Sequence, residues 1–435
     1  MKTQIRNVIL LTMNRTNDIL QNATITFEDD RIIAINEEIE ADYIVDGEGA
    51  ICMPGMINTH AHFSMIPFRS LQDDCPDRLR KFLLPLEEKA MNAALAKAAC
   101  KVAIAESLLA GVTTVLDMYY FPETLASCYA EMNMRAVVAE TIINQPSCDA
   151  KEAHGGLAIA KEFLPAYHTH PLITPAIAPH SPVTNTEAAL KEAMELAKQY
   201  NTLLTMHVSE MDYEMDYFQK QYQMTPVAYL DSIGMLNEHC VLAHAIHVTE
   251  EDCRLIKKRG ARISHCIGSN TKAGKGIAPV KRMLEHGIAV GLGTDGPASG
   301  NTLDLFTQMN LFAKFHKVAN HDRSIFPAKE IVELATISGA KVLQLDHEIG
   351  SLEVGKKADI VLVETKSANM FPIHDPMSAL VYSANASNVN HVFVNGTQVV
   401  KNKQLLIQNL TQLIDDCRIA MHQFTAEAEI LQRAL

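Results

Sequence analysis

This sequence lacks the features of secreted, membrane-spanning and nucleic-acid-binding proteins. No apolar run approaches the ~20 residues that a membrane helix requires. The apolar run at residues 8–11 is too short for the core of a signal peptide. Basic residues are few, because 38 Lys and Arg face 51 Asp and Glu, giving a net charge of -13. A surface of this sign repels nucleic acids and anionic membranes, so neither is an expected partner.

Paired cysteines are also absent. The nine cysteines contain no CxxC pair and match neither a disulfide framework nor a zinc knuckle. An odd number of scattered cysteines is typical of reduced thiols in the cytosol, so we expect a cytoplasmic protein. Apolar residues, by contrast, make up 48% of the 435-residue chain. They can fill a barrel of about 250 residues and a smaller second module.

The middle of the chain alternates between apolar, strand-like runs and helical patterns. The eight strand-like runs are residues 55–60, 112–118, 135–142, 173–180, 203–210, 240–247, 261–267 and 288–295. The helical patterns include residues 84–110, 186–199, 250–259 and 280–286. Continuous apolar strands separated by helices are typical of a parallel sheet that is covered on its outside. Eight such units predict an α/β protein built on a (β/α)8 TIM-type barrel.

Both ends of the chain are rich in short predicted strands, which we expect to join in one composite β module. The tail has helical periodicity. The predicted organisation is an N-terminal β part at residues 1–54, the barrel at 55–346, a C-terminal β part at 347–404 and a C-terminal helix at 405–435.

Polar residues able to take part in catalysis lie at or near the ends of the eight predicted strands. They are His60, Asp117, Glu140, His180, His207, His244, His265 and Asp295. Active sites of such barrels lie at the C-terminal ends of the strands. So many coincidences are not expected of purely structural residues, and an active site is therefore predicted at this end.

Four residues of this region have the types and spacing of metal ligands. His60 and His62 are alternate residues of a strand, so both imidazoles can reach one metal ion. Such a pair alone is a weak signal, because histidines often pack or cap. His207 and Asp295, at the ends of the fifth and eighth strands, add ligands of suitable type. A further position is left for water, whose pKa the metal lowers toward neutrality.

Glu210 is the candidate general base. It follows the predicted ligand His207 by three residues, where its carboxylate can accept a proton from the water. The alternative is an exposed glutamate on the following helix. The nearby ligands favour the general base, and the predicted chemistry is attack of hydroxide on an electrophilic carbon.

These motifs resemble those of the amidohydrolase superfamily. The matching stretches are PGMINTHAH from residue 54, HVSE from 207, SHCIGSN from 264 and GTDG from 293, together with His244. The terminal strands resemble the composite β-sandwich of that superfamily. Residues 84–87, 178–182, 276–280 and 296–299 resemble the methylthioadenosine/S-adenosylhomocysteine deaminase group. Its neighbours are guanine and pterin deaminases and triazine chlorohydrolases.

The resemblance implies one divalent metal ion, bound by His60, His62, His207 and Asp295. Zinc is favoured, and iron or manganese could use the same ligands. The fourth predicted strand contains no lysine, whereas binuclear members usually bridge two metals with a carboxylated lysine there. Glu210 would deliver protons to a ring nitrogen and to the leaving amine. His244 would orient the hydroxide and the substrate, and Asp295 would accept the remaining proton.

The resemblance also implies the substrate contacts. His180 and Ser299 would contact the purine, and Glu87 would hold the ribose hydroxyls. Arg78 stands in the place of a tryptophan that nucleoside deaminases usually have, and is a further candidate for substrate binding. Glu140 stands where members that bind S-adenosylhomocysteine carry an arginine for its carboxylate.

The expected function is hydrolytic deamination of an aminopurine nucleoside. Adenosine, 5′-deoxyadenosine, 5′-methylthioadenosine and S-adenosylhomocysteine are the candidate substrates, with ammonia and the inosine analogue as products. One alternative is an enzyme acting on guanine, a pterin or a triazine. A non-catalytic barrel is a second alternative, disfavoured because all four ligands and the base are present. A homo-oligomer is expected, since symmetric dimers are common among soluble proteins.

Overall fold

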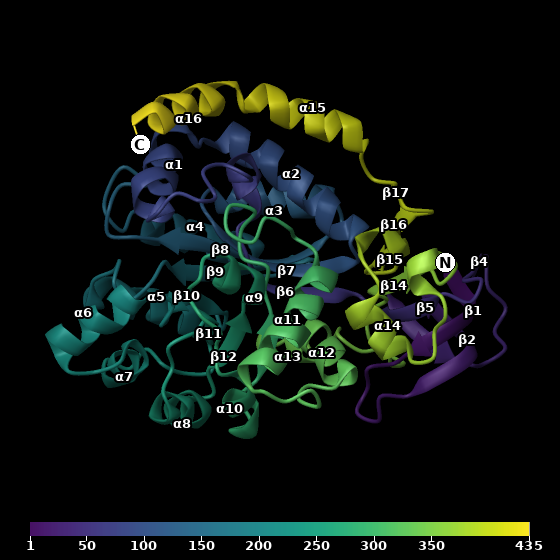
Figure 1. Cartoon of the computed structure of the whole chain (residues 1–435). Helices are drawn as coiled ribbons and strands as arrows, with labels where there is room; N and C mark the ends of the chain where they lie inside the picture. Colours follow the sequence, from purple (N-terminus) through teal and green to yellow (C-terminus); the bar gives the residue numbers. More distant parts are fainter. Residues whose placement is uncertain (435) are drawn as a thin grey trace.

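Eight parallel strands form the central sheet of the computed structural model, which describes residues 1–434 (Figure 1). In chain order they are β6 (Met56–Ala61), β7 (Val112–Tyr119), β8 (Arg135–Ile142), β9 (Ile173–Pro179), β10 (Leu204–Val208), β11 (Cys240–His244), β12 (Arg262–His265) and β13 (Val290–Leu292). The chain beyond β13 returns to β6, where the Asp295 amide donates to the His60 carbonyl oxygen (3.1 Å). The predicted barrel is confirmed, and each of the eight predicted runs overlaps one of its strands.

Helices cover the outside of this barrel. They are α1 (Leu84–Ala90), α2 (Ala93–Leu109), α3 (Pro122–Glu131), α4 (Gly156–Tyr167), α5 (Glu187–Gln199), α6 (Asp212–Tyr222), α7 (Pro226–Ser232), α8 (Glu250–Arg259), α9 (Ile267–Lys272), α10 (Val280–Glu285), α11 (Leu305–Ala319), α12 (Ala328–Ala335), α13 (Ile337–Val342) and α14 (Pro376–Tyr382). Within residues 1–434, none of the helices has the length and hydropathy needed to cross a bilayer.

The single helix predicted at residues 84–110 is wrong, because the chain breaks between α1 and α2. Met91 and Asn92 have extended backbones, and the Asn92 side chain accepts a hydrogen bond from the Leu95 amide. Asparagine is a favoured N-cap because its side chain satisfies one of the free amides of the first turn. The apolar periodicity continues across the break, so it conceals the new start at Asn92.

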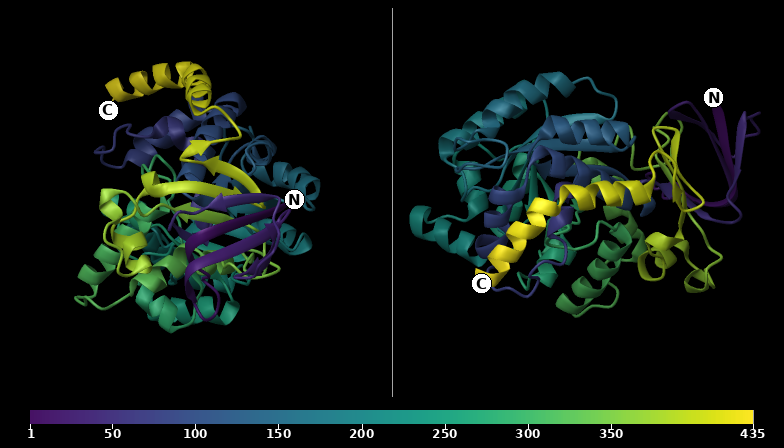
Figure 2. Two further views of the ribbon diagram at one scale, coloured as in Figure 1. Left: turned by 90° about the vertical axis from the view of Figure 1, so that its right-hand side faces the viewer. Right: turned by 90° about the horizontal axis from the view of Figure 1, so that it is seen from above.

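A second, nine-stranded sheet combines both ends of the chain at one side of the barrel (Figure 2). Its strands are β1 (Lys2–Leu11), β2 (Ile19–Glu28), β3 (Arg31–Ile35), β4 (Tyr43–Asp46), β5 (Ile51–Pro54), β14 (Ile360–Val363), β15 (Val389–Val394), β16 (Thr397–Lys401) and β17 (Gln404–Leu405). The two ends meet where β5 pairs antiparallel with β14. Phe27 of β2 and Phe393 of β15 lie in strands that are not neighbours, yet their ring centroids are 5.4 Å apart. The sheet therefore curls over its own apolar core.

A buried ion pair joins this sheet to the barrel. Arg135 at the start of β8 donates from Nε and Nη2 to the Asp359 carboxylate, at 3.0 and 3.2 Å. Asp359 directly precedes β14 and also accepts a hydrogen bond from the Asn395 amide (2.7 Å). Both side chains are under 10% exposed. Every charge here has a close partner, as stable burial of ions requires.

The tail forms two helices instead of the one predicted at residues 405–435. They are α15 (Leu410–Ala420) and α16 (His422–Ala434), and position 435 lies outside the described residues. The chain bends at Met421, so that α15 packs on α2 and α16 on α1. The bend buries Phe424 edge-on against Phe68, with ring centroids 4.7 Å apart. The tail thereby runs back across the barrel from the second sheet (Figure 2).

Candidate active site

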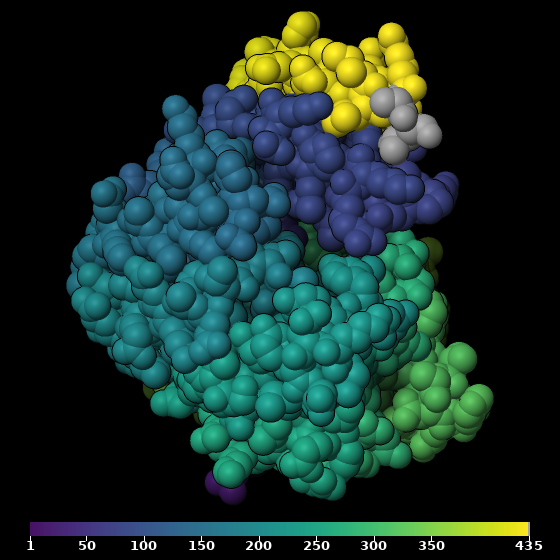
Figure 3. Space-filling view, turned by 90° about the vertical axis from the view of Figure 1, so that its left-hand side faces the viewer, coloured from purple at the N-terminus to yellow at the C-terminus, as the bar shows by residue number. Residues whose placement is uncertain are grey.

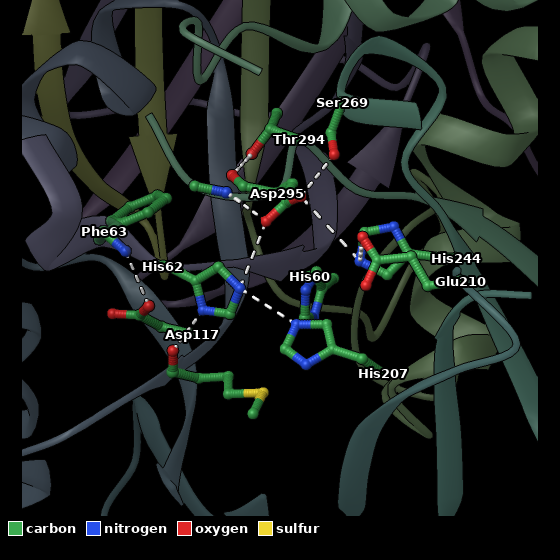
Figure 4. Close-up of polar contacts among 12 residues, drawn as sticks. His60, His62, Phe63, Asp117, His207, Glu210, His244, Ser269, Thr294 and Asp295 are labelled. Carbon is green, nitrogen blue, oxygen red and sulfur yellow. Dashed lines mark hydrogen bonds and ion pairs between the residues drawn. The ribbon is translucent and has the colours of Figure 1, made fainter. Parts of the chain in front are cut away.

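The C-terminal end of the barrel brings the predicted metal ligands together (Figure 4). His60 lies in β6 and His62 just after it, His207 lies in β10, and Asp295 follows β13. Nε2 of His62 is 3.3 Å from Asp295 Oδ1 and 3.3 Å from His207 Nε2. Seen from this end, the surface is hollowed between the blue and teal parts of the chain (Figure 3).

The donor atoms of this cluster fit a cation. His60, His62 and Asp295 can offer ligand atoms within 4.8 Å of one another, and so can His60, His207 and His244. His60 is fully buried, and neither of its ring nitrogens has a hydrogen-bond partner among the described residues. Leaving a buried polar group unpaired costs about 1–3 kcal/mol, so uncompensated nitrogens facing other donor atoms indicate a bound ion.

Hydrogen bonds behind the cluster turn three imidazoles toward its centre. Nδ1 of His62 donates to the Met118 carbonyl oxygen (2.6 Å), and Nδ1 of His207 to that of His180 (2.7 Å). Nδ1 of His244 donates to Asn270 Oδ1 (2.8 Å). In a neutral imidazole, a proton on Nδ1 leaves the lone pair on Nε2. Outer partners of this kind fix the tautomer and orientation of metal-binding histidines.

Burial and charge set the protonation of the ligands. Burial holds the pKa of His60 and of His207 well below the usual value, so both imidazoles are neutral. Burial alone would raise the pKa of Asp295, but His62 and His244 outweigh it and hold that pKa well below its usual range. Neutral imidazoles and an ionised carboxylate are the forms that bind metals.

Two site residues have left-handed backbones at strand ends. The φ angle of His244 is 69° and that of Asp295 is 59°. Non-glycine residues rarely adopt this conformation, and it is held only where the surrounding structure fixes it. Asp295 is fixed by hydrogen bonds from Ser269 Oγ to Oδ2 (2.5 Å) and from the Gly296 amide to Oδ1 (2.7 Å).

Glu210 lies beside this cluster, as predicted from HVSE. Its Oε1 is 3.5 Å from His244 Nε2 and 2.5 Å from Lys275 Nζ. Burial would raise its pKa, but the nearby His244 and Lys275 outweigh burial and lower it to about 2. The backbone amides of Ser209 and Glu210 donate to the Glu214 carboxylate, each at 2.9 Å, which fixes the loop.

Several of these supporting residues were not predicted. Ser269 and Asn270 lie in SHCIGSN, which was matched to a family but given no contacts. Glu214 lies in the helix that follows Glu210. In the sequence, a buried glutamate of a helix cannot be told from an exposed one. Lys275 lies in a loop between two glycines, and no pattern links it to a carboxylate 65 residues earlier.

The predicted substrate contacts lie around the same end of the barrel. The His180 ring packs at 4.8 Å from His207, and Glu87 is buried and accepts a hydrogen bond from the Tyr119 hydroxyl (2.7 Å). Arg78 has protein partners for its guanidinium, which donates to the carbonyl oxygens of Ala298 and Phe68 and contacts Asp73. It therefore braces the loop that carries Ser299. Contact of these four residues with a substrate stays a prediction.

Three of the eight strand-end residues do not join the site. Leu116 and Met118 belong to the core inside the barrel, and so do Val137 and Ala139. Alternate residues point to opposite faces, so Asp117 and Glu140 point outward. Asp117 accepts hydrogen bonds from the Phe63 amide and the Tyr129 hydroxyl, and Glu140 faces Gly156 at the start of α4.

The third, His265, pairs with His316 of α11 at 3.1 Å between their Nε2 atoms. Asp117, Glu140 and His265 therefore lie outside the cluster of candidate ligands. A strand can end on a polar side chain that faces the surrounding helices.

Comparisons with known proteins agree with this geometry. The model of the amidohydrolase family matches residues 51–399. The chain is 35% identical to a protein of Thermodesulfovibrio yellowstonii named 5-methylthioadenosine/S-adenosylhomocysteine deaminase, covering 99% of this chain and 97% of that one. The chain belongs to the amidohydrolase family. The resemblance seen in the sequence is thus confirmed.

Two further relatives of this amidohydrolase are informative. A protein of Methanopyrus kandleri named 5′-deoxyadenosine deaminase is 35% identical, covering 94% of this chain and 96% of that one. The crystal structure of an adenosine deaminase from Xanthomonas campestris with bound zinc is 28% identical. It superposes with a TM-score of 0.95 and covers 98% of both chains.

Proposed function

We propose that this amidohydrolase deaminates adenine nucleosides by hydrolysis. The candidate substrates are adenosine, 5′-deoxyadenosine, 5′-methylthioadenosine and S-adenosylhomocysteine, and the products are ammonia and the inosine analogue. The observation that carries the proposal is the Glu210 carboxylate beside His244, at the edge of a buried cluster of donor atoms. The names of the relatives that match nearly the whole chain support the substrate class.

The proposal includes one divalent metal ion, held by His60, His62, His207 and Asp295. The unpaired nitrogens of His60 and the outer hydrogen bonds of His62 and His207 support this set. Zinc is the first candidate, because a related adenosine deaminase structure contains it, and iron or manganese suit the same donors. When bound, the metal supplies a nucleophilic hydroxide at neutral pH.

Proton transfers are the work of the carboxylates. Glu210 takes a proton from the attacking water and passes it to the ring nitrogen, while the C–O bond forms at the carbon that bears the amine. Asp295 takes the proton of the added hydroxyl, and this proton passes through Glu210 to the leaving amine. The C–N bond then breaks, ammonia leaves and a carbonyl remains. Each positioned proton transfer contributes roughly 10²–10⁴-fold.

His244 is proposed to orient the water and the substrate. Its Nε2 lies 3.5 Å from Glu210 Oε1 and 4.0 Å from Asp295 Oδ2, between the two carboxylates that move protons. Glu87 is proposed to hold the ribose hydroxyls, and His180 and Ser299 to contact the purine. Arg78 would act on substrate indirectly, through the loop that it braces.

We also propose a cytoplasmic homo-oligomer that acts on small molecules. All nine cysteines are free, and seven of them are buried, which suits a reducing compartment. Size-exclusion chromatography with light scattering tests the oligomeric state, and a single 48.0 kDa species would contradict it.

The test of function is ammonia release by the zinc-loaded protein. The panel contains the four adenine nucleosides, and adenine, guanine and a pterin as alternative substrates. We expect turnover of at least one adenine nucleoside, and a loss of roughly 10²–10⁴-fold in Glu210→Gln. Glu195→Gln, an exposed glutamate, is the matched control. Activity on guanine or a pterin alone would overturn the nucleoside assignment. No ammonia release from any compound of the panel would overturn deamination.

A further inference from the structure

One short segment after β12 contacts three residues of the active site. Its contacts are Ser269 Oγ to Asp295 Oδ2 (2.5 Å), Asn270 Oδ1 to His244 Nδ1 (2.8 Å) and Lys275 Nζ to Glu210 Oε1 (2.5 Å). Ser269 and Asn270 lie in α9. Lys275 lies beyond its end, in a loop, and is the only cation of the three.

The backbone of this loop delivers the lysine to the site. Gly274 and Gly276, on either side of Lys275, have φ angles of 65° and 122°. At 122° a residue with a side chain would be strained, so the turn requires glycine. The Lys275 amide also donates to the Asn270 carbonyl oxygen at 2.9 Å. The chain is therefore turned back over α9, with the Lys275 ammonium inside.

Lys275 is the closest partner of the Glu210 carboxylate. The two side chains are 18% and 16% exposed, so little water competes for their contact. Oε1 has Lys275 at 2.5 Å and His244 at 3.5 Å, whereas Oε2 has no hydrogen bond to any residue of 1–434. Glu214 fixes the backbone of Glu210 but does not hold its side chain. The direction of the carboxylate thus depends on Lys275.

The lysine keeps its charge in this place. Burial lowers its pKa, but the negative charges of Glu210 and Asp295 outweigh burial and raise it. A hydrogen bond between two charged groups is short and roughly twice as strong as a neutral one. Holding a reacting group in one orientation lowers the barrier, because the entropy of orientation is lost before the reaction.

We propose that Lys275 is a positioning residue, which holds Oε1 of Glu210 toward His244 and Asp295. This inference rests on the proposed deamination. Lys275 acts through Glu210, so its removal weakens proton transfer while substrate still binds. The loss should be smaller than that of Glu210→Gln, because the carboxylate itself remains.

The kinetic test is Lys275→Met beside Lys275→Arg in the zinc-loaded protein. We expect Lys275→Met to lower kcat roughly 10- to 100-fold, below the full effect of a proton-transfer group, with KM nearly unchanged. Its acid limb of kcat should move to higher pH, because removal of the cation raises the pKa of Glu210. Lys275→Arg should recover part of the rate. Lys281→Met, at an exposed position of α10, is the matched control.

A crystal structure of Lys275→Met tests the geometry without any turnover. The inference expects Glu210 to have turned away from His244 while His60 and His207 stay in place. Glu210 found in its original orientation would overturn it. So would an unchanged kcat, or a rise in KM at unchanged kcat, which would make Lys275 a substrate-binding residue.

The two proposals fail in different ways. An inactive wild type on every substrate overturns the deamination, and the crystal structure of the variant then still decides the positioning role. An active wild type matched by Lys275→Met overturns only the role of Lys275. Should Lys275→Met not fold, Lys275→Arg and Lys275→Gln carry the same comparison of kcat, KM and acid limb.

Discussion

One buried polar group at each end of the barrel shows two opposite arrangements. At the N-terminal end, Arg135 and Asp359 form an ion pair in which both carboxylate oxygens have partners. At the C-terminal end, His60 is fully buried without a partner for either ring nitrogen, and Nε2 of His244 also has none among the described residues. The first arrangement joins two sheets. The arrangement at the C-terminal end leaves imidazole nitrogens without a protein partner beside other ligand atoms.

This difference separates structural from functional burial. The Arg135–Asp359 pair serves the fold and is satisfied by protein partners, because an unpaired charge would destabilise the folded state. Buried imidazoles of the site are instead oriented through one ring nitrogen, while the other nitrogen faces the ligand cluster. The Nδ1 hydrogen bonds of His62 and His207 are the examples. Changes at the C-terminal end should therefore affect catalysis, and changes at the N-terminal end should affect stability.

The largest expected effect is that of Asp295→Asn. The change removes a proposed metal ligand and a proposed proton acceptor together, so we expect kcat/KM to fall by more than about 10⁴-fold, the upper range for one proton-transfer group. Metal content, measured on the same samples, should fall too. Asp322→Asn, in an exposed loop, is the control. Full metal content with full activity in Asp295→Asn would exclude both roles.

At the other end, Asp359→Ala should lower the free energy of unfolding by about 3–5 kcal/mol, because it leaves the Arg135 guanidinium buried and unpaired. Denaturant unfolding measures the loss. The activity of the molecules that remain folded should stay within the range of the wild type. Glu187→Ala, which removes an exposed ion pair with Lys191, should change stability little. A large loss of kcat in folded Asp359→Ala would contradict the separation.

The smallest effect expected is that of Asn270→Ala. The side chain of Asn270 accepts the hydrogen bond from Nδ1 of His244 and does not face the ligand cluster. Its loss should lower kcat/KM roughly 10- to 100-fold, as for other residues that orient a site histidine through its second nitrogen. Metal content should not change. Steady-state kinetics beside Asn320→Ala, on the end of α11, measure the effect. A stability loss with intact kinetics would make Asn270 purely structural.

The sequence predicted those features that local patterns encode. The eight strands were predicted because each is a continuous apolar run, and the ligands because they occupy strand ends in short motifs. The outward direction of Asp117 and Glu140 was missed, since it depends on which alternate residues face the barrel interior. Lys275 was missed because its contact with Glu210 arises only when two loops from different strands meet. Such contacts belong to the tertiary structure and have no local signature.

Titration of the metal-free protein with zinc tests the buried cluster most directly. Calorimetry should find one zinc ion per wild-type chain, and His60→Ala should lose that binding while its helix content stays that of the wild type. One ion per chain with loss in the variant is the result we predict. Binding that is unchanged in His60→Ala, or two equivalent ions per wild-type chain, would contradict a single metal centre built on these histidines.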